Sequence, residues 1–323
     1  MKAKETAQQW TAGINELTIG ATSAAGGTRG KPVSIGGART LPGLAYEGNV
    51  GRRPAIAVEV RDAGAEAWPE ELRRQYGAIL GDPAAWARRA VELGADLICL
   101  RLAGIHPDGG NRSAEQAVAT VKAVLAAVNV PLIVWGCGAE EKDNAVLPKC
   151  SEAAKGENCL FGTITQKNYR TLVAACLADG HKLIAESPLD INIAKQTNIL
   201  AHDVGFPLEN IVIFPTTAAM GYGFEYVYSI MERSRLAGLG GDQLLAQPVL
   251  CDVGTEAWRA KEATAPEEVL AGFGPAKERG VLWETLTATN YLQAGADLLV
   301  MRHPQAVAAA RKALDRLCAP AKA

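Results

Sequence analysis

The stretch "IVIFPTTAAMGYGFEYVYSIMERSRL", residues 211–236, holds one complete strand–loop–helix unit. Its first four residues are apolar and β-branched or aromatic, and they end at Pro215, which cannot donate to a sheet. A loop with two threonines and two glycines follows. Apolar side chains then recur at the spacing of one helical face, at Phe224, Val227, Tyr228 and Met231. We expect a buried strand, a polar loop and a helix that packs through this face.

The same unit recurs from residue 55 to the end of the chain. Short apolar runs predict strands at residues 55–60, 96–100, 132–135, 159–161, 182–185, 211–214, 248–251 and 297–301. The runs are continuous rather than alternating, which is typical of parallel strands buried on both faces. Eight strand–helix units predict an α/β protein with a (β/α)8 TIM barrel. A doubly wound sheet is disfavoured, because "RDAGAEAWPEEL" after the first strand lacks a G-x-G-x-x-G fingerprint.

Capping residues mark the helices between these strands. Asp82 is an expected N-cap, Pro83 suits the first helical position, and Gly94 follows the end of the same helix. Ser113 and Gln116 have the spacing of a capping box. Three residues of the last helix, Ala306, Ala310 and Leu314, are expected to face the protein core.

Residues 1–53 differ from the barrel predicted for residues 54–323. "NELTIG" and "KPVSIGG" alternate polar and apolar residues, and "ATSAAGGTRG" separates them, which predicts an N-terminal β-hairpin with a glycine-rich turn. Residues 26–30 could form an anion-binding nest. The interpretation we favour is a flap that closes the N-terminal mouth of the barrel.

Composition excludes several classes of partner. The formal net charge of the 323 residues is −2, with no basic stripe, so neither nucleic acid nor an anionic membrane is an expected partner. The polar first nine residues do not resemble a signal peptide, and no window approaches about 18 apolar residues.

Seven cysteines, an odd number, predict reduced thiols in the cytoplasm, and their spacing matches no iron–sulfur motif. We therefore expect no metal site in this chain.

Polar residues follow every predicted strand, at the end of a barrel where ligands bind. Together with the apolar Met220, the candidate rim residues are Arg61, Asp62, His106, Asp108, Asn111, Cys137, Glu140, Asp143, Asn144, Thr163, Thr165, Glu186, Asp190, Asn192, Thr216, Thr217, Tyr222, Asp252, Thr255, Arg302 and His303. No metal-binding or nucleophile-elbow motif occurs among them, so no catalytic residue is predicted. The loops after the last two strands contain a single glycine in total, which disfavours a phosphate site.

Two pairs of rim residues leave alternatives open. His106 and His303 could meet above the barrel, although separate hydrogen-bonding or surface roles are favoured. Glu186 and Asp190 could form an acid–base pair. Asp190 could equally cap the helix predicted from residue 191, and we favour the cap.

Four motifs, in order along the chain, resemble the small subunit of the corrinoid iron–sulfur protein. They are "GGTRGK…SIGG", "AESPLDINIAKQTN", "PTTAAMGYGFEYVYSIMERSRL" and "LLVMRHPQAV". The archaeal relative of that family is the delta subunit of the acetyl-CoA decarbonylase/synthase complex. The resemblance implies a (β/α)8 barrel that pairs with a large subunit and carries methyl groups on a corrinoid in the reductive acetyl-CoA (Wood–Ljungdahl) pathway.

The resemblance also implies partners and cofactors. The four-iron cluster and the cobalamin-binding domain belong to the large subunit, a methyltetrahydrofolate corrinoid methyltransferase supplies the methyl group, and acetyl-CoA synthase receives it. The small subunit's barrel mouth helps to cover the corrinoid, so the chain itself would be non-catalytic or accessory. With barrel geometry, this indicates candidate corrinoid contacts at Asn192, Thr216, Thr217, Met220, Gly221, Tyr222, Arg302 and His303.

Two other functions remain open from the sequence. An autonomous TIM-barrel pterin-dependent methyltransferase would use Asp190 or Glu186 with Asn192 to hold a folate ring. A purely structural subunit would contact no ligand at all.

Overall fold

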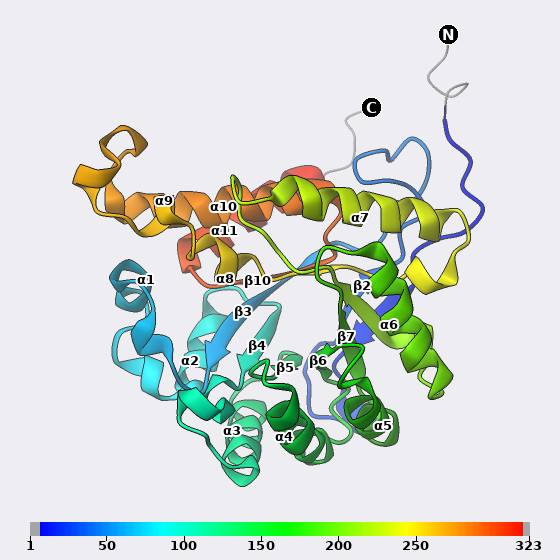
Figure 1. The fold of residues 1–323 in the computed structure, drawn as a ribbon, viewed down its shortest axis with the longest axis horizontal. Coiled ribbons are helices and arrows are strands. Elements are labelled where there is room, and N and C mark those ends of the chain that lie inside the picture. Colours follow the sequence, from blue (N-terminus) through cyan, green and yellow to red (C-terminus); the bar gives the residue numbers. More distant parts are fainter. Residues whose placement is uncertain (1–6, 319–323) are drawn as a thin grey trace.

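The computed structural model describes residues 7–318, and its centre is a parallel eight-stranded barrel (Figure 1). The barrel strands are β3 (Ala55–Arg61), β4 (Leu97–Arg101), β5 (Leu132–Trp135), β6 (Leu160–Ile164), β7 (Lys182–Glu186), β8 (Ile211–Phe214), β9 (Leu250–Cys251) and β10 (Leu298–Met301). Their order is β8-β7-β6-β5-β4-β3-β10-β9, and a parallel bridge from Ile213 to Val249 closes the circle. The predicted (β/α)8 barrel is confirmed, although β9 is shorter than the run at residues 248–251 suggested.

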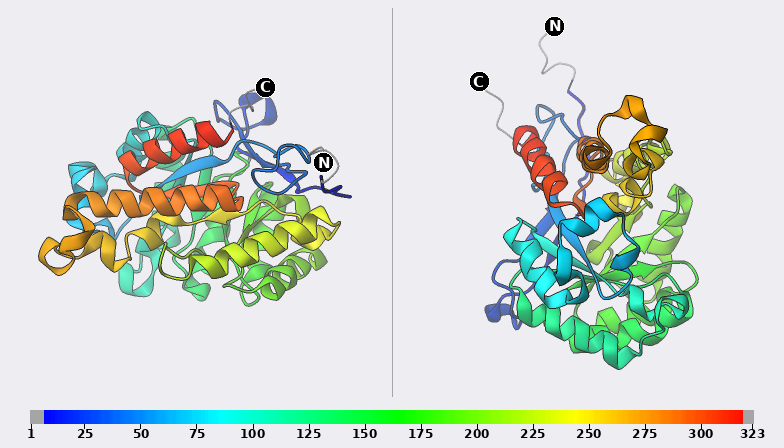
Figure 2. Two further views of the ribbon diagram at one scale, coloured as in Figure 1. Left: turned by 90° about the horizontal axis from the view of Figure 1, so that it is seen from above. Right: turned by 90° about the vertical axis from the view of Figure 1, so that its left-hand side faces the viewer.

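One long helix follows each barrel strand and covers its outer side. The helices are α1 (Glu70–Arg74), α2 (Pro83–Glu92), α3 (Ala114–Ala127), α4 (Glu140–Ala153), α5 (Tyr169–Asp179), α6 (Ile191–Asp203), α7 (Phe224–Leu239), α8 (Val253–Ala257), α9 (Lys261–Thr264), α10 (Ala276–Ala294) and α11 (Pro304–Leu317). The short helices α1, α8 and α9 are additions to the loops after β3 and β9. Figure 2 shows α7, α10 and α11 running side by side along one flank of the barrel.

The predicted caps are confirmed. The Asp82 carboxylate accepts hydrogen bonds from the first turn of α2, and Gly94 beyond that helix has φ +95°. Ser113 and Gln116 form the reciprocal capping box of α3. On α7, Val227 and Met231 are buried as expected. Tyr228 corrects the prediction, because it is 39% exposed and donates to Glu232 on the same helix at 3.0 Å.

The N-terminal hairpin closes one end of the barrel. Strands β1 (Glu16–Ile19) and β2 (Val33–Gly36) pair antiparallel. Three hairpin side chains, Leu17, Ile19 and Ile35, are buried in one cluster with the inward-facing residues of the barrel strands. The hairpin contacts the segments that lead into the strands, so the predicted flap over the N-terminal mouth is confirmed. The boundary between residues 53 and 54 remains a prediction.

The glycine-rich turn of the hairpin holds a carboxylate of the barrel itself. Glu157 accepts hydrogen bonds from the Thr28 backbone N–H at 3.1 Å and from Arg29 Nε at 2.8 Å. The buried Arg29 guanidinium also donates to the carbonyl oxygens of Val128 and Leu125. These contacts fasten the flap to the barrel, and they occupy the region where a nest for a free anion was considered.

Candidate functional site

The inward side chains of β3 change from apolar to charged toward the C-terminal mouth of the barrel. Ala55 and Ala57 belong to the interior cluster, while the alternate residues of the strand pack outward against the helices. Because successive side chains of a strand point to opposite faces, Glu59 and Arg61 point inward like Ala55 and Ala57. They lie nearer the C-terminal end of the barrel than the two alanines do. The top of the barrel interior is therefore polar, above an apolar interior plugged by the hairpin.

Glu59 is the centre of a buried charge network. One of its oxygens, Oε2, accepts from Arg302 Nε at 2.8 Å. The other, Oε1, lies 3.1 Å from Arg302 Nη2, 3.3 Å from Arg101 Nε and 3.5 Å from Arg61 Nε. Burial raises the pKa of Glu59, but the charges of Arg302, Arg101 and Arg61 outweigh it and hold the pKa at about 2. Glu59 is therefore ionised at neutral pH.

Arg101 carries the network across the mouth. Its Nη2 donates to Asp252 at 2.7 Å, and its guanidinium lies 4.6 Å from the centre of the Trp135 ring. The Asp252 backbone N–H donates to the Thr217 hydroxyl at 2.7 Å. Residues of β4 and β5 and of the loops after β8 and β9 thus meet at the C-terminal mouth.

Arg302 connects the mouth to the surrounding loops. Its Nη2 donates to the Thr255 hydroxyl at 2.9 Å, and its guanidinium lies over the Trp68 ring at 4.7 Å. Its backbone carbonyl accepts from the Tyr76 hydroxyl. Arg302, the residue that follows β10, therefore contacts the loops after both β3 and β9 through its side chain and its backbone.

A second buried carboxylate supports Arg302 from behind. Glu284 on α10 accepts from the Arg302 backbone N–H at 2.6 Å and from Trp258 Nε1 at 2.6 Å. Burial raises the pKa of Glu284 to about 7, against these N–H donors, which lower it. His303 stacks on Trp258 with ring centres 5.8 Å apart, and burial lowers its pKa to about 4.

The loop after β8 lies against α9 and α10. The Tyr291 hydroxyl bonds both backbone groups of Ala218, and Trp283 Nε1 donates to the Met220 carbonyl at 3.2 Å. The Tyr222 hydroxyl donates to Glu262 at 2.7 Å and accepts from the Lys261 backbone at 2.9 Å. The loop is consequently well anchored, with its aromatic end at the outer edge of the mouth.

Three exposed tyrosines lie on this loop and in the first turns of α7. Tyr222 is 49% exposed, Tyr226 is 64% exposed, and Tyr228 stacks on Phe224 with ring centres 6.4 Å apart. Large amphipathic rings of this kind are enriched where proteins contact one another. Tyr226 and Tyr228 are two residues apart on α7, so they point to different sides of that helix.

The eight candidate contact residues fall into different surroundings. Thr217 and Arg302 belong to the mouth network, and His303 is buried behind it. Met220, Gly221 and Tyr222 lie on the outer loop, whereas the exposed Asn192 is in the first turn of α6. Thr216 stands at the start of the loop with φ +66°.

Hydrogen bonds decide between the alternatives for the two pairs of rim residues, Glu186 with Asp190 and His106 with His303. Asp190 caps α6 by accepting from the Asn192 backbone at 2.7 Å, as the favoured interpretation predicted, and Glu186 accepts from the Thr163 hydroxyl at 2.6 Å. His106 is partly exposed and accepts from the Asp108 backbone at 3.1 Å, in surroundings unlike those of buried His303. Separate roles for the two histidines are thus supported.

Sequence reasoning missed the two residues that organise the mouth. Glu59 lies inside a predicted strand, and Arg101 directly follows the next one. The signal was present in "AIAVEVR", where two-residue alternation places the only charges of the run on the same face as two alanines. A charge on the inward face of a barrel strand demands a partner from another strand.

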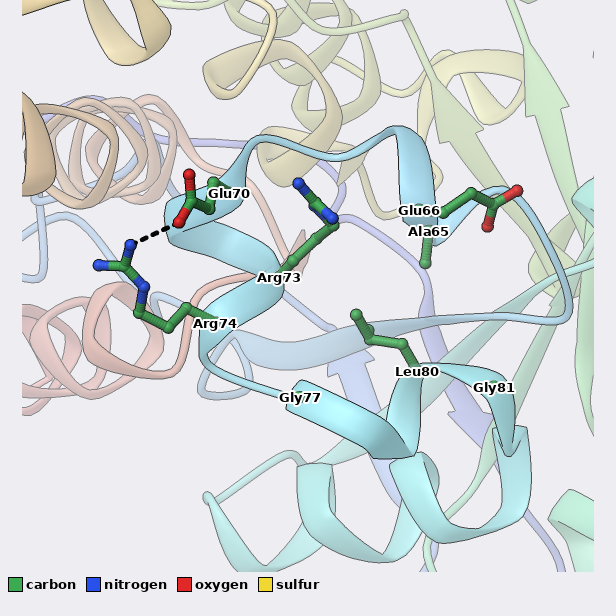
Figure 3. A pocket seen from close by; sticks show the side chains of 8 residues that line it. All are labelled: Ala65, Glu66, Glu70, Arg73, Arg74, Gly77, Leu80 and Gly81. Atoms are coloured by element: carbon green, nitrogen blue, oxygen red, sulfur yellow. Dashed lines mark hydrogen bonds and ion pairs between the residues drawn. The ribbon is translucent and has the colours of Figure 1, made fainter.

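A surface cavity of about 530 Å³ lies beside the mouth, between α1 and the following turn (Figure 3). Arg73 and Leu80 point toward it, while Glu70 and Arg74 pair with each other at its outer side. Arg73 Nε is already bonded to the Trp68 carbonyl at 2.9 Å. The cavity contains none of the predicted contact residues.

Residues 7–318 contain neither a metal-binding cluster nor a membrane-spanning helix. They contain no group of three or more His, Cys, Asp or Glu side chains placed to hold a metal ion. Within the same residues, no helix is both long enough and apolar enough to cross a membrane.

Comparison with known families identifies the group of proteins. The family model described as CO dehydrogenase/acetyl-CoA synthase delta subunit matches residues 16–310. The chain belongs to this family. The resemblance drawn from the four sequence motifs is therefore confirmed.

Curated relatives agree with the family model. The chain is 37% identical over 316 residues to the acetyl-CoA decarbonylase/synthase complex subunit delta of Archaeoglobus fulgidus, covering 96% of this chain and 70% of that protein. It is 36% identical to subunit delta 1 of Methanosarcina thermophila, with 96% and 72% covered. For subunit delta of Methanopyrus kandleri the identity is also 36%, with 94% and 74% covered.

Solved structures confirm the fold alone. Dihydropteroate synthase of Xanthomonas albilineans, in complex with indole-2-carboxylic acid and 6-chloroguanine, superposes with a TM-score of 0.57 at 17% identity. The match covers 83% of this chain and 95% of that one. Dihydropteroate synthase of Stenotrophomonas maltophilia gives a TM-score of 0.54 at the same identity, with 83% of this chain and 94% of that one covered.

Proposed function

We propose that the chain is the small subunit of a heterodimeric corrinoid iron–sulfur methyl carrier in the reductive acetyl-CoA pathway. The large subunit holds the corrinoid and the four-iron cluster, and the barrel mouth of this chain covers the corrinoid. Methyl groups arrive from methyltetrahydrofolate through a corrinoid methyltransferase and leave to acetyl-CoA synthase. Membership of the delta-subunit family is the observation that carries the proposal. The seven free cysteines support a cytoplasmic location.

The residues at the mouth fit a large, flat ligand held by another chain. A corrin ring has broad faces and a rim of amide side chains, which can both donate and accept hydrogen bonds. The mouth supplies guanidinium groups at Arg61 and Arg101, a hydroxyl at Thr217 and the exposed Tyr222 at its edge. When bound, the corrinoid supplies the cobalt atom that carries the methyl group.

This chain's own part in the proposal is to cover and to exclude water. Thr217 and Arg302 lie in the mouth, and we propose Thr216, Met220, Gly221, Tyr222 and Asn192 as contacts around its edge. His303 is buried, so we assign it a supporting role behind Arg302. The anchoring of the loop by Tyr291 and Trp283 favours a surface that is formed before its partner arrives.

The filled mouth argues against an autonomous pterin methyltransferase. Glu59, Trp135 and Arg302 at the mouth are all buried, and each is engaged with another residue of the network. The two carboxylates of that alternative are otherwise engaged, Asp190 in the cap of α6 and Glu186 with Thr163.

Mixing the chain with its corrinoid-loaded large subunit tests the proposal. We expect a stable complex and a change in the corrinoid absorption spectrum, which a purely structural subunit would not cause. The chain alone should not transfer methyl groups from methyltetrahydrofolate to free cobalamin. Transfer by the isolated chain would favour the methyltransferase, and a complex with an unchanged spectrum would favour the structural subunit.

A further inference from the structure

Arg61 is the least compensated cation of the mouth. Its only ion pair among residues 7–318 is with Glu59, at 3.5 Å and without a hydrogen bond. Its Nε is buried without a partner, and its Nη1 makes one long bond of 3.3 Å to the Gly64 carbonyl. A guanidinium group has five N–H donors, so most of the donor capacity of Arg61 is unused.

The neighbouring carboxylates are committed to other arginines. Glu59 is bonded bidentately by Arg302, and Asp252 is bonded by Arg101 at 2.7 Å. Three guanidinium groups thus face these two carboxylates, which leaves one positive charge. The nearby Glu284 carboxylate bonds backbone N–H groups and Trp258 rather than a guanidinium group. Burial lowers the pKa of Arg61, and repulsion from Arg302 and Arg101 lowers it further, against the attraction of Glu59.

Asp62, the next residue in the chain, is also occupied. Its carboxylate accepts from the Gly104 backbone at 2.8 Å and lies 3.4 Å from Arg112 Nη1. The Arg61 side chain is 21% exposed, so an external group can reach it. A cation that is partly desolvated and poorly paired costs stability in the free chain, and such a cost is typical of binding sites.

We propose that Arg61 binds a carboxylate side chain of the protein that docks on the barrel mouth. The planar guanidinium fork matches a carboxylate in bidentate geometry, and the incoming negative charge would neutralise the mouth. The identity of the docking protein rests on the proposed function. The poor pairing of Arg61 in the free chain is independent of the proposed function.

The first experiment measures the free chain, with Arg61→Gln compared with Arg101→Gln. Both variants lose one positive charge at the mouth, but only Arg101 has short contacts, to Asp252 and Trp135. We expect the melting temperature of Arg61→Gln to equal or exceed that of the wild type, and that of Arg101→Gln to fall by several degrees. A fall for Arg61→Gln as large as that for Arg101→Gln would overturn the proposal, because Arg61 would then be a structural counter-ion of Glu59.

The second experiment measures the dissociation constant of the complex with the large subunit at about 50 mM and 300 mM salt. Arg61→Gln should weaken binding about tenfold at low salt and less at high salt, because a charge pair is screened. Arg61→Lys should recover part of the loss. The matched control is Arg74→Gln on α1, which removes an exposed arginine paired with Glu70 and should leave binding unchanged.

The outcomes separate the two proposals. Wild-type affinity for Arg61→Gln would overturn the role of Arg61, as would a loss that is equal at both salt concentrations, which indicates a neutral carbonyl acceptor. If the wild-type chain does not bind the large subunit at all, the proposed function fails. The melting temperatures of the free chain then still decide whether Arg61 is structural.

Discussion

Arg302 donates from Nε to Glu59 at 2.8 Å, and this contact joins the last barrel strand to the first. The same carboxylate lies within 3.5 Å of Arg101 and Arg61, so one buried anion organises three arginines from three adjacent strands. The contact closes the C-terminal mouth, while the hairpin closes the other end.

Removing the Glu59 charge should destabilise the fold. Glu59→Gln leaves Arg302, Arg101 and Arg61 close together with no central anion, and breaking a buried pair in this way typically costs about 3 to 5 kcal/mol. Chemical denaturation measures the change. Glu71→Gln on α1, which disturbs only an exposed pair with Arg74, should shift the free energy of unfolding by less than about 0.5 kcal/mol. Equal effects of the two substitutions would show that the mouth network does not stabilise the fold.

The contribution of Glu59 should depend on pH in the acid range. Its pKa is about 2 in the folded chain and near 4.5 when unfolded, so the unfolded chain binds more protons between these values. The stabilisation is therefore fully present above about pH 5 and is lost as the pH falls toward 2. The difference in unfolding free energy between wild type and Glu59→Gln should shrink over this range. A difference that stays constant from pH 6 to pH 3 contradicts the assignment.

Gly94 should resist substitution because of its backbone. It follows α2 with φ +95°, a conformation that β-branched residues rarely adopt. Gly94→Val should cost about 1 kcal/mol or more. Gly81→Val is the control, because Gly81 has open space around it and no positive φ. Similar denaturation midpoints for the two variants would argue against backbone strain at Gly94.

Bulk in the outer loop should disturb a bound partner. Gly221 has φ +80°, so any side chain there strains the backbone, and Gly221→Ala measures that strain alone. Gly221→Trp adds bulk at the edge of the mouth, and its complex with the large subunit should show an altered corrinoid spectrum and slower methyl transfer. If the alanine and tryptophan complexes behave alike, Gly221 does not face the partner.

The sequence contained most of the fold because its signals are local. The apolar runs and the caps at Asp82 and Ser113 depend on neighbours within a few residues, and they specify strands and helices without knowledge of the rest. The hairpin was predictable for the same reason, although its bond to Glu157 was not, since Glu157 lies 129 residues from Thr28.

The mouth could be predicted only in part because its contacts are distant in sequence. Glu59 meets Arg302 across 243 residues, and no local pattern indicates that partner. The loop after β8 carries five of the eight candidate contacts, and Tyr291 and Trp283 anchor it from a helix about 70 residues away. No local pattern in the sequence indicates that anchoring.

Hydrogen exchange of the chain, free and bound to its corrinoid-loaded large subunit, tests the central claim most directly. Docking on the C-terminal mouth should slow exchange in the loops after β3, β4, β8 and β9 and leave the turn of the β1–β2 hairpin unchanged. Slower exchange confined to the hairpin end, with these loops unaffected, would contradict a mouth that covers the corrinoid.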